Sequence, residues 1–167
     1  MAARLSFELA RLNAEDAPAY NAFLTRGVQQ HTDTLRISPR DIEAAPFATA
    51  SPESATFVAR GQEGAWHGVV TVEREQGREK RRHIAWILRM YVTSGSAGAG
   101  VGRALLRRAI EHARELPGVD KLNLTVAAHN QRAVALYESE GFRSFAREED
   151  AFRDAEPRVE LSMTRRL

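Results

Sequence analysis

Cysteine is absent from the 167-residue sequence. The chain therefore has no disulfide, no thiolate metal ligand and no cysteine nucleophile. Long apolar runs are also missing. No stretch approaches the roughly 18 apolar residues of a membrane span, and residues 1–13 contain no apolar segment typical of a signal peptide. We expect a cytoplasmic protein that has no membrane partner.

An excess of charge of one sign is lacking as well. The 24 basic and 22 acidic residues leave a formal net charge of +2, which gives no support to nucleic-acid binding. The five histidines show no metal-ligand spacing, so we expect no metal site. The length suits one core of ordinary size and predicts a single domain over residues 1–167.

Glycine, in contrast, is concentrated in one place. Residues 95–102 hold four glycines, Gly95, Gly98, Gly100 and Gly102, between an apolar run at 84–92 and a helix-patterned run at 101–116. Glycine permits positive φ and a close approach of an anion, and a helix start offers unpaired N–H groups with partial positive charge. The segment predicts a phosphate-binding loop that would suit a diphosphate-bearing cofactor.

Several families place a glycine-rich turn between a strand and a helix. A nucleotide-binding Walker A loop requires Lys and then Ser or Thr after its last glycine, but Gly102 is followed by Arg103 and Ala104. A dinucleotide fingerprint requires an acidic residue at the end of the next strand, and Asp120 precedes that strand. A tight turn without a ligand is the remaining alternative for the loop taken alone.

A second motif follows the loop. Residues 122–126 alternate as a strand, Asn130 suits a helix N-cap, and the next helix carries Ala133, Leu136 and Tyr137 before it ends at Gly141 and Phe142. With both motifs the chain resembles the GNAT superfamily of acyl-CoA-dependent N-acyltransferases. The pattern of Arg82, His83 and Ala85 ahead of residues 90–92 is similar to that of small bacterial members.

The resemblance implies an α/β (α+β) fold: a mixed, mostly antiparallel central sheet of about seven strands, flanked by helices and splayed at the acyl-CoA site. The resemblance is strong from residue 83 to 167. In the first half of the chain it rests only on the order of the expected strands and helices. One departure concerns the loop, where Ala97 stands at a position usually held by Arg or Gln. The backbone cradle stays possible, but one polar contact to the cofactor is lost.

The resemblance also implies the chemistry. An amine would attack the thioester of acetyl-CoA directly, and Tyr137 would be the acid that protonates the leaving thiolate. A backbone N–H of residues 90–92 would stabilise the oxyanion, and Val92 is the residue expected to donate it. The residues expected to bind the cofactor are Met90, Tyr91, Val92, Ala97, Gly98, Ala99, Gly100, Val101, Gly102, Arg103, Asn130, Ala133 and Tyr137.

The base that deprotonates the amine is left open. Glu73, Glu75 and His83 are candidates, and a base acting through water is an equal alternative. The acceptor is expected to be a small-molecule or peptide amine, and the resemblance leaves a homodimer open. A non-catalytic domain that binds acyl-CoA as a sensor or partner is the competing function.

The remaining elements are expected from their patterns. Strands are predicted at 5–9, 56–60, 66–75, 83–92, 143–147 and 158–163, and helices at 14–26 and 38–43. The resemblance implies that the proline-containing segment 28–53 flanks the acceptor, and a plain surface connection is an equal alternative. The charged run 78–82 is expected to be a solvated hairpin tip.

Overall fold

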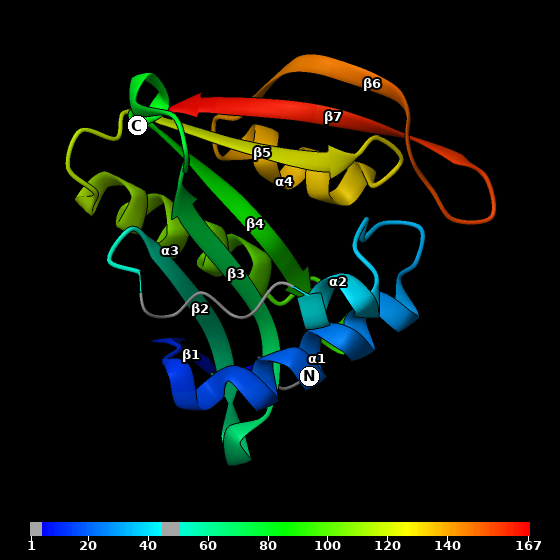
Figure 1. Cartoon of the computed structure of the whole chain (residues 1–167). Coiled ribbons are helices and arrows are strands. Elements are labelled where there is room, and N and C mark those ends of the chain that lie inside the picture. Colours follow the sequence, from blue (N-terminus) through cyan, green and yellow to red (C-terminus); the bar gives the residue numbers. More distant parts are fainter. Residues whose placement is uncertain (1–4, 45–50) are drawn as a thin grey trace.

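A seven-stranded sheet forms the centre of the computed structural model, which describes residues 5–44 and 51–167 (Figure 1). The strand order is β1-β2-β3-β4-β5-β7-β6, and every neighbouring pair is antiparallel except β4 and β5. The strands are β1 (Phe7–Arg11), β2 (Ser54–Gly61), β3 (Trp66–Arg74), β4 (Ile84–Val92), β5 (Lys121–Ala127), β6 (Arg143–Arg153) and β7 (Pro157–Arg166). The fold class predicted from the sequence is therefore confirmed.

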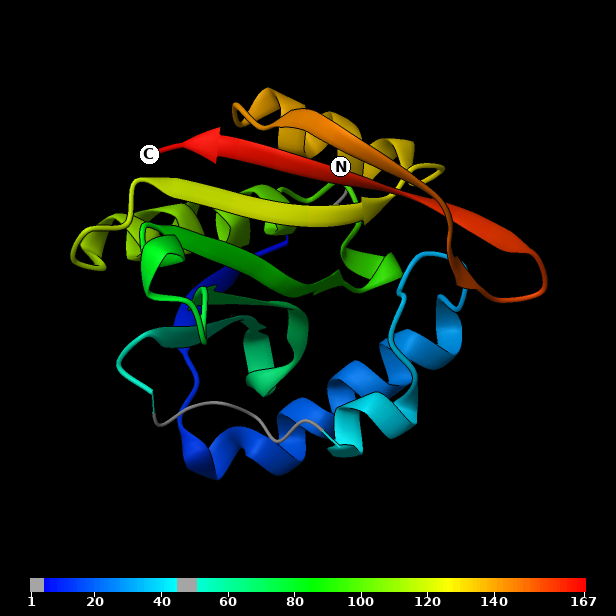
Figure 2. The same cartoon turned by 45° about the horizontal axis from the view of Figure 1, so that its top comes forward.

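Within the described residues, four α-helices cover the two faces of the sheet (Figures 1 and 2). They are α1 (Ala17–Gln30), α2 (Pro39–Ala44), α3 (Val101–Glu115) and α4 (Gln131–Ser139). Helices α3 and α4 pack on one face, and α1 and α2 pack on the other, so two hydrophobic clusters lie on opposite sides of the strands. None of the helices in the described part of the chain is long and apolar enough to cross a membrane.

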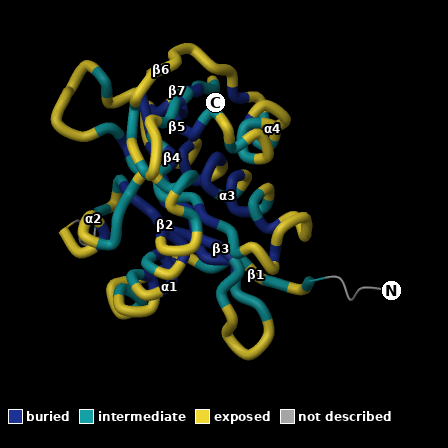
Figure 3. Tube along the Cα trace, turned by 90° about the vertical axis from the view of Figure 1, so that its right-hand side faces the viewer, coloured by how far each residue is buried: buried dark blue, intermediate teal, exposed yellow. Residues whose placement is uncertain are grey.

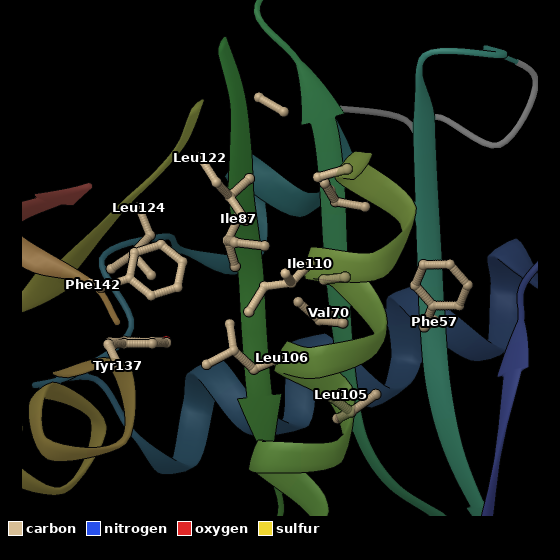
Figure 4. Close-up of a cluster of buried hydrophobic side chains, with 14 of the residues drawn as sticks. Phe57, Val70, Ile87, Leu105, Leu106, Ile110, Leu122, Leu124, Tyr137 and Phe142 are labelled. Carbon is tan, nitrogen blue, oxygen red and sulfur yellow. The ribbon is translucent and has the colours of Figure 1, made fainter. Parts of the chain in front are cut away.

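The larger cluster joins α3 and α4 to the middle of the sheet. Figure 4 shows Leu106 and Ile110 of α3 against Ile87 of β4, while Tyr137 and Phe142 pack beside Leu124 of β5. The apolar stripe of α3 faces inward over its whole length, as expected from its sequence pattern. This packing fixes α3 and α4 relative to β4 and β5, where the two strands begin to separate.

Helix α1 runs past the end that the sequence suggested. We expected it to stop at Arg26 before Gly27, but it continues to Gln30. Gly27 is buried inside the helix, and a Cβ there would lie 2.5 Å from Cε1 of Tyr91. The glycine therefore allows α1 to approach β4 closely and does not end the helix.

The last two strands are also longer than predicted. Strand β6 extends to Arg153 and β7 begins at Pro157, whereas alternation supported only 143–147 and 158–163. Residues 143–150 of β6 are exposed at the edge of the sheet (Figure 3). An edge strand exposed on both faces carries no apolar alternation, so its length is hidden from the sequence. Residues 45–50 of the predicted acceptor-flanking segment lie outside the described residues.

The parallel pair β4 and β5 separates after a short contact. Only three residues of β4, Ile84, Ala85 and Trp86, pair with β5. Strand β4 then bulges, because Arg89 and Met90 together oppose the single residue Val70 between the pairs Thr71–Leu88 and Val69–Tyr91. A bulge increases local twist and can end strand pairing. The splayed sheet that the resemblance implied is therefore present (Figure 1).

Candidate functional site

A cleft of about 1040 Å³ lies where β4 and β5 separate. Its lining residues come from both faces of the sheet, so the cleft passes between the two strands. We call the part formed by residues 96–103 and α4 the loop side. The part formed by residues 31–37 between α1 and α2, with Arg89, Phe152 and Glu160, is the linker side.

The loop side begins with the glycine-rich turn. Gly98 and Gly100 adopt φ values of +82° and +84°, which side-chain-bearing residues rarely adopt. Gly100 is also the N-cap of α3, and the first hydrogen bond of the helix runs from the N–H of Ala104 to its carbonyl at 3.0 Å. The N–H groups of residues 101–103 therefore lack partners within the helix and face the region where an anion is favoured.

The hydroxyl groups of Thr93 and the buried Ser96 hold the start of this turn. Thr93 Oγ1 donates to Ser96 Oγ at 2.8 Å, and Nδ1 of His67 lies 2.8 Å from the same oxygen. The N–H groups of Ala97 and Ala99 bond to carbonyls inside the turn. Ala97 lines the cleft, but Ala99 does not. The structure thus brings every predicted cofactor-binding residue except Ala99 to the cleft lining.

Helix α4 supplies the other wall of the loop side. Oδ1 of Asn130 accepts a hydrogen bond from the N–H of Ala133 at 3.2 Å, as expected for an N-cap. Arg132 lies over the turn, with Nη2 3.6 Å from the position of a Cβ on Gly98. Arg103, in contrast, is turned toward Ser139 and Glu140, which holds α3 against α4. Its side chain is therefore already engaged.

Tyr137 lies inside the cleft rather than at its edge. The residue is buried, its ring meets that of Phe142 in an edge-on contact, and its hydroxyl donates to Sδ of Met90 at 3.6 Å. Burial raises the pKa of Tyr137 to about 12 because the phenolate would lose its hydration. The phenol therefore stays protonated throughout the physiological range.

The β4 segment of Met90, Tyr91 and Val92 forms the floor of the cleft. Met90 is the second residue of the bulge, Tyr91 and Val92 follow it, and all three lie beyond the last β5 partner of the strand. Their edge of β4 is thus free of pairing with β5 among the described residues. The backbone groups of these three residues and the Tyr137 hydroxyl therefore border the same part of the cleft.

The three predicted base candidates lie at the other end of the sheet. Glu73 pairs with Trp86 and Ser54 in the ladder, Glu75 accepts hydrogen bonds from Arg81 and Trp86, and His83 is exposed before β4. The hydrogen bonds from Arg81 and Trp86 lower the pKa of Glu75 despite partial burial. None of the three lines the cleft, so the structure does not bring them to the site.

The neighbouring charged run behaves largely as expected. Residues 78–80 and Arg82 are exposed, while Arg81 is half-buried against Glu75. Arg82 also pairs with Glu53. Ion pairs at an exposed hairpin tip contribute little to stability, so this run remains mainly a solvated turn.

The linker side contains an ion pair that the sequence did not reveal. Nη1 of Arg36 lies 2.8 Å from each carboxylate oxygen of Glu160, and these residues are 124 positions apart. The Glu160 side chain is 8% exposed and is the one acidic group among the described residues that line the cleft. Glu160 sits in an alternating strand like many structural residues, so no sequence signal singled it out.

Metal chemistry has no ready ligands in the described part of the chain. Residues 5–44 and 51–167 contain no group of three or more histidine and acidic side chains able to hold an ion. The cleft combines unpaired helix amides, a buried phenol and apolar walls instead. Such a site suits an extended anionic ligand with an apolar portion.

Comparison with known proteins agrees with this geometry. Residues 18–142 match the model of the acetyltransferase (GNAT) family, which covers most of the chain. The chain belongs to the GNAT family of acetyltransferases, whose members take the acetyl group from acetyl-CoA.

Solved structures share the fold over nearly the whole chain. A GNAT-family acetyltransferase from Streptococcus pneumoniae has a TM-score of 0.82 at 24% identity and covers 97% of this chain and 99% of its own. A Salmonella typhimurium protein solved with its cofactor acetyl-CoA has a TM-score of 0.79 at 19% identity, with coverage of 97% and 94%. At such identities the likeness establishes the fold alone.

A curated sequence relative is more similar over a shorter segment. The mycothiol acetyltransferase of Propionibacterium freudenreichii is 39% identical over 88 residues, which are 52% of this chain and 27% of that protein. The chain thus matches about a quarter of the length of this relative. The likeness supports acetyl transfer as a family trait and leaves the acceptor to be inferred from the site.

Proposed function

We propose that the protein transfers an acetyl group from acetyl-CoA to a primary amine by direct attack while both substrates are bound. The observation that carries the proposal is one continuous cleft whose loop side contains the start of α3 and whose linker side is formed by separate elements. Two substrates could enter from opposite faces and meet between β4 and β5. A covalent acyl-enzyme is not needed, which is consistent with the absence of cysteine from the sequence.

The loop side would hold acetyl-CoA through its phosphates. The N–H groups of residues 101–103 and the partial positive charge of α3 favour a diphosphate at that position. Arg132 would supply the side-chain contact that Ala97 lacks, because its guanidinium already lies over Gly98. Asn130 and Ala133 border the same side and would contact the pantetheine portion.

The reaction would take place beside Met90. As the amine nitrogen forms a bond to the acetyl carbon, negative charge develops on the carbonyl oxygen and is stabilised by a backbone N–H of residues 90–92, with Val92 as the expected donor. The carbon–sulfur bond then breaks, and its electron pair leaves on sulfur. The nitrogen loses one proton in this process, and the sulfur gains one.

Tyr137 would assist the departure of the thiolate. A phenol with a pKa of about 12 is a weaker acid than a thiol, whose reference pKa is about 8.5. Complete proton transfer from Tyr137 is therefore unfavourable, and its contribution is a hydrogen bond that strengthens as charge develops on sulfur. The proton that finally neutralises sulfur would come from water when the product leaves, while Tyr137 keeps its own proton.

Glu160 would bind the amine on the linker side. Its carboxylate faces the cleft, and Arg36 contacts both oxygens through a single nitrogen, so lone pairs remain for an ammonium group. The base assigned to this step is Glu160, acting directly or through a water molecule. This assignment replaces Glu73, Glu75 and His83, which lie outside the cleft.

A two-substrate kinetic assay tests the proposal. Thiol release should require both acetyl-CoA and an amine, and initial rates should give intersecting lines when both concentrations are varied. Tyr137→Phe should reduce kcat about 10- to 100-fold, the effect of a lost hydrogen bond to a developing charge, and should leave acetyl-CoA affinity unchanged. Parallel lines would contradict direct attack.

The competing function is a sensor or partner domain that binds acetyl-CoA without turnover. Ala97 favours that alternative, because a cofactor contact usual in the family is missing. The buried phenol beside Met90 favours catalysis, since simple binding has no need of a proton donor there. Binding of acetyl-CoA with no thiol release across a broad panel of amines would favour the sensor.

A further inference from the structure

Arg89 occupies an unusual place in β4. The residue sits in the bulge with φ of +49°, a left-handed conformation that side-chain-bearing residues seldom adopt. It directly precedes Met90, which contacts the Tyr137 hydroxyl. Backbone strain of this kind is concentrated at functional sites. The fold therefore holds Arg89 next to the expected reaction centre.

The guanidinium of Arg89 is not committed to another residue in the described part of the chain. Four arginines line the cleft there, and two of them are engaged, Arg36 by Glu160 and Arg103 by Glu140. Arg132 lies on the loop side, over Gly98. Arg89 forms no hydrogen bond or ion pair with the described residues. It is thus the uncommitted cation on the linker side.

Asp41 of α2 is the acidic neighbour of Arg89. The pKa of Asp41 is lowered mainly by a hydrogen bond from the N–H of Ser38, which lies 2.6 Å from Oδ2, with a smaller contribution from Arg89. Asp41 is exposed, does not line the cleft and serves to cap α2. This neighbour places Arg89 on the α2 face of the sheet and leaves it available to a ligand.

The surroundings of Arg89 limit what that ligand can be. Apolar side chains of Leu35, Ile37, Leu88 and Phe152 line the same side of the cleft, and the one carboxylate there is Glu160. An ammonium group suits Glu160, whereas a carboxylate suits the planar fork of a free guanidinium. A polyamine would place a second positive charge near Arg89, which is unfavourable.

We propose that Arg89 binds a carboxylate of the acceptor, so that the acceptor is an amino acid whose amine is acetylated. This assignment deepens the proposed function and rests on it. The carboxylate would face Arg89, the amine would face Glu160 and the thioester, and the amino-acid side chain would contact the apolar walls. Arg89 is a specificity residue here and takes no part in proton transfer.

Matched substrate pairs test this assignment. Each common L-amino acid is compared with the primary amine that lacks only its carboxylate, and kcat/KM for thiol release is measured with wild-type protein, Arg89→Gln and Arg89→Lys. In at least one pair the amino acid should be the better substrate. Arg89→Gln should reduce that preference about 10- to 100-fold, the effect of losing a charge-assisted hydrogen bond. Arg89→Lys should keep part of the preference.

The matched control is Arg40→Gln, which removes an exposed arginine of α2 that does not line the cleft. Its substrate preference should equal that of the wild type. Acetyl-CoA affinity, measured by calorimetry, should be the same in all four proteins. The assignment is wrong if the amine without a carboxylate is the equal or better substrate in every pair, if no amino acid is acetylated, or if Arg89→Gln keeps the preference. If the wild-type protein did not bind acetyl-CoA, that result would instead contradict the proposed function itself.

Discussion

The two sides of the cleft are built in different ways. The loop side consists mainly of backbone groups, glycines and the two helix starts at Gly100 and Asn130, all within a short span of sequence. The linker side consists of side chains from β4, β6, β7 and the segment between α1 and α2. A backbone cradle can serve a constant cofactor, whereas side chains from many elements can vary with the acceptor.

The largest effect should come from the loop side. Gly100→Asp would force a side chain onto φ of +84° and put a negative charge in the phosphate cradle. We expect acetyl-CoA affinity to fall more than about 100-fold by calorimetry, since like charges at such a site cost several kcal/mol. Gly77→Asp is the matched control, because Gly77 has φ of +78°, has open space around its Cβ position and does not line the cleft. Unchanged affinity in Gly100→Asp would remove the loop from the site.

A change on the linker side should leave acetyl-CoA binding intact. Glu160→Gln keeps the shape of the side chain but removes its charge, so the acceptor amine loses its partner while Arg36, which is half-exposed, can be hydrated. We expect kcat/KM for the acceptor to fall about 10- to 100-fold with acetyl-CoA affinity unchanged. Glu148→Gln, on an exposed residue paired with Glu160 in the ladder, should change neither quantity. If Glu160→Gln reduced acetyl-CoA affinity as much as kcat/KM for the acceptor, the two sides of the cleft would not bind separate substrates.

A smaller effect should follow from Arg132→Ala. The loss of one guanidinium near a phosphate is expected to weaken acetyl-CoA binding about tenfold. Ala97→Arg should restore most of that affinity in the double variant, because it returns a cation to the same turn. Arg114→Ala, at the exposed end of α3, should have no effect on binding. Failure of the rescue would show that Arg132 does not take the place of the missing loop arginine.

The smallest effect concerns stability at high pH. The pKa of Tyr137 is raised to about 12 in the folded state, against about 10 in the unfolded chain. Above pH 10 the unfolded tyrosine loses its proton while the folded one keeps it, so the free energy of unfolding should decrease as pH rises. By pH 11 this contribution is about 1 kcal/mol. Urea unfolding should show that the decrease is smaller in Tyr137→Phe, and identical pH dependence would contradict the buried state of the phenol.

The difference between the two sides also explains how much the sequence could predict. The turn at Gly98 and Gly100, the cap at Asn130 and the phenol of Tyr137 follow from local rules of backbone conformation and spacing. These features were visible because their physical requirements are met by neighbouring residues. The splay between β4 and β5 was expected only from the family resemblance, and the structure shows it as a pairing of three residues of β4 with β5.

The linker side could not be predicted in the same way. Arg36 and Glu160 meet only after the chain has folded, and neither belongs to a local motif. The predicted role of Gly27 was wrong for a similar reason. In the sequence a glycine at this point is typical of a helix end, whereas its actual role is a close contact with Tyr91 that forms only in the folded protein. Glu73, Glu75 and His83 were plausible by type, but the antiparallel course of β3 and β4 carries them away from the cleft.

Calorimetric titration of the wild-type protein with acetyl-CoA tests the central claim most directly. The cleft between β4 and β5, with the amides at the start of α3 and Arg132 over Gly98, predicts saturable binding of one acetyl-CoA per chain at micromolar concentration. The affinity should decrease as ionic strength rises, because phosphate contacts are screened. Absence of binding at millimolar acetyl-CoA would contradict the assignment of the cleft and the function built on it.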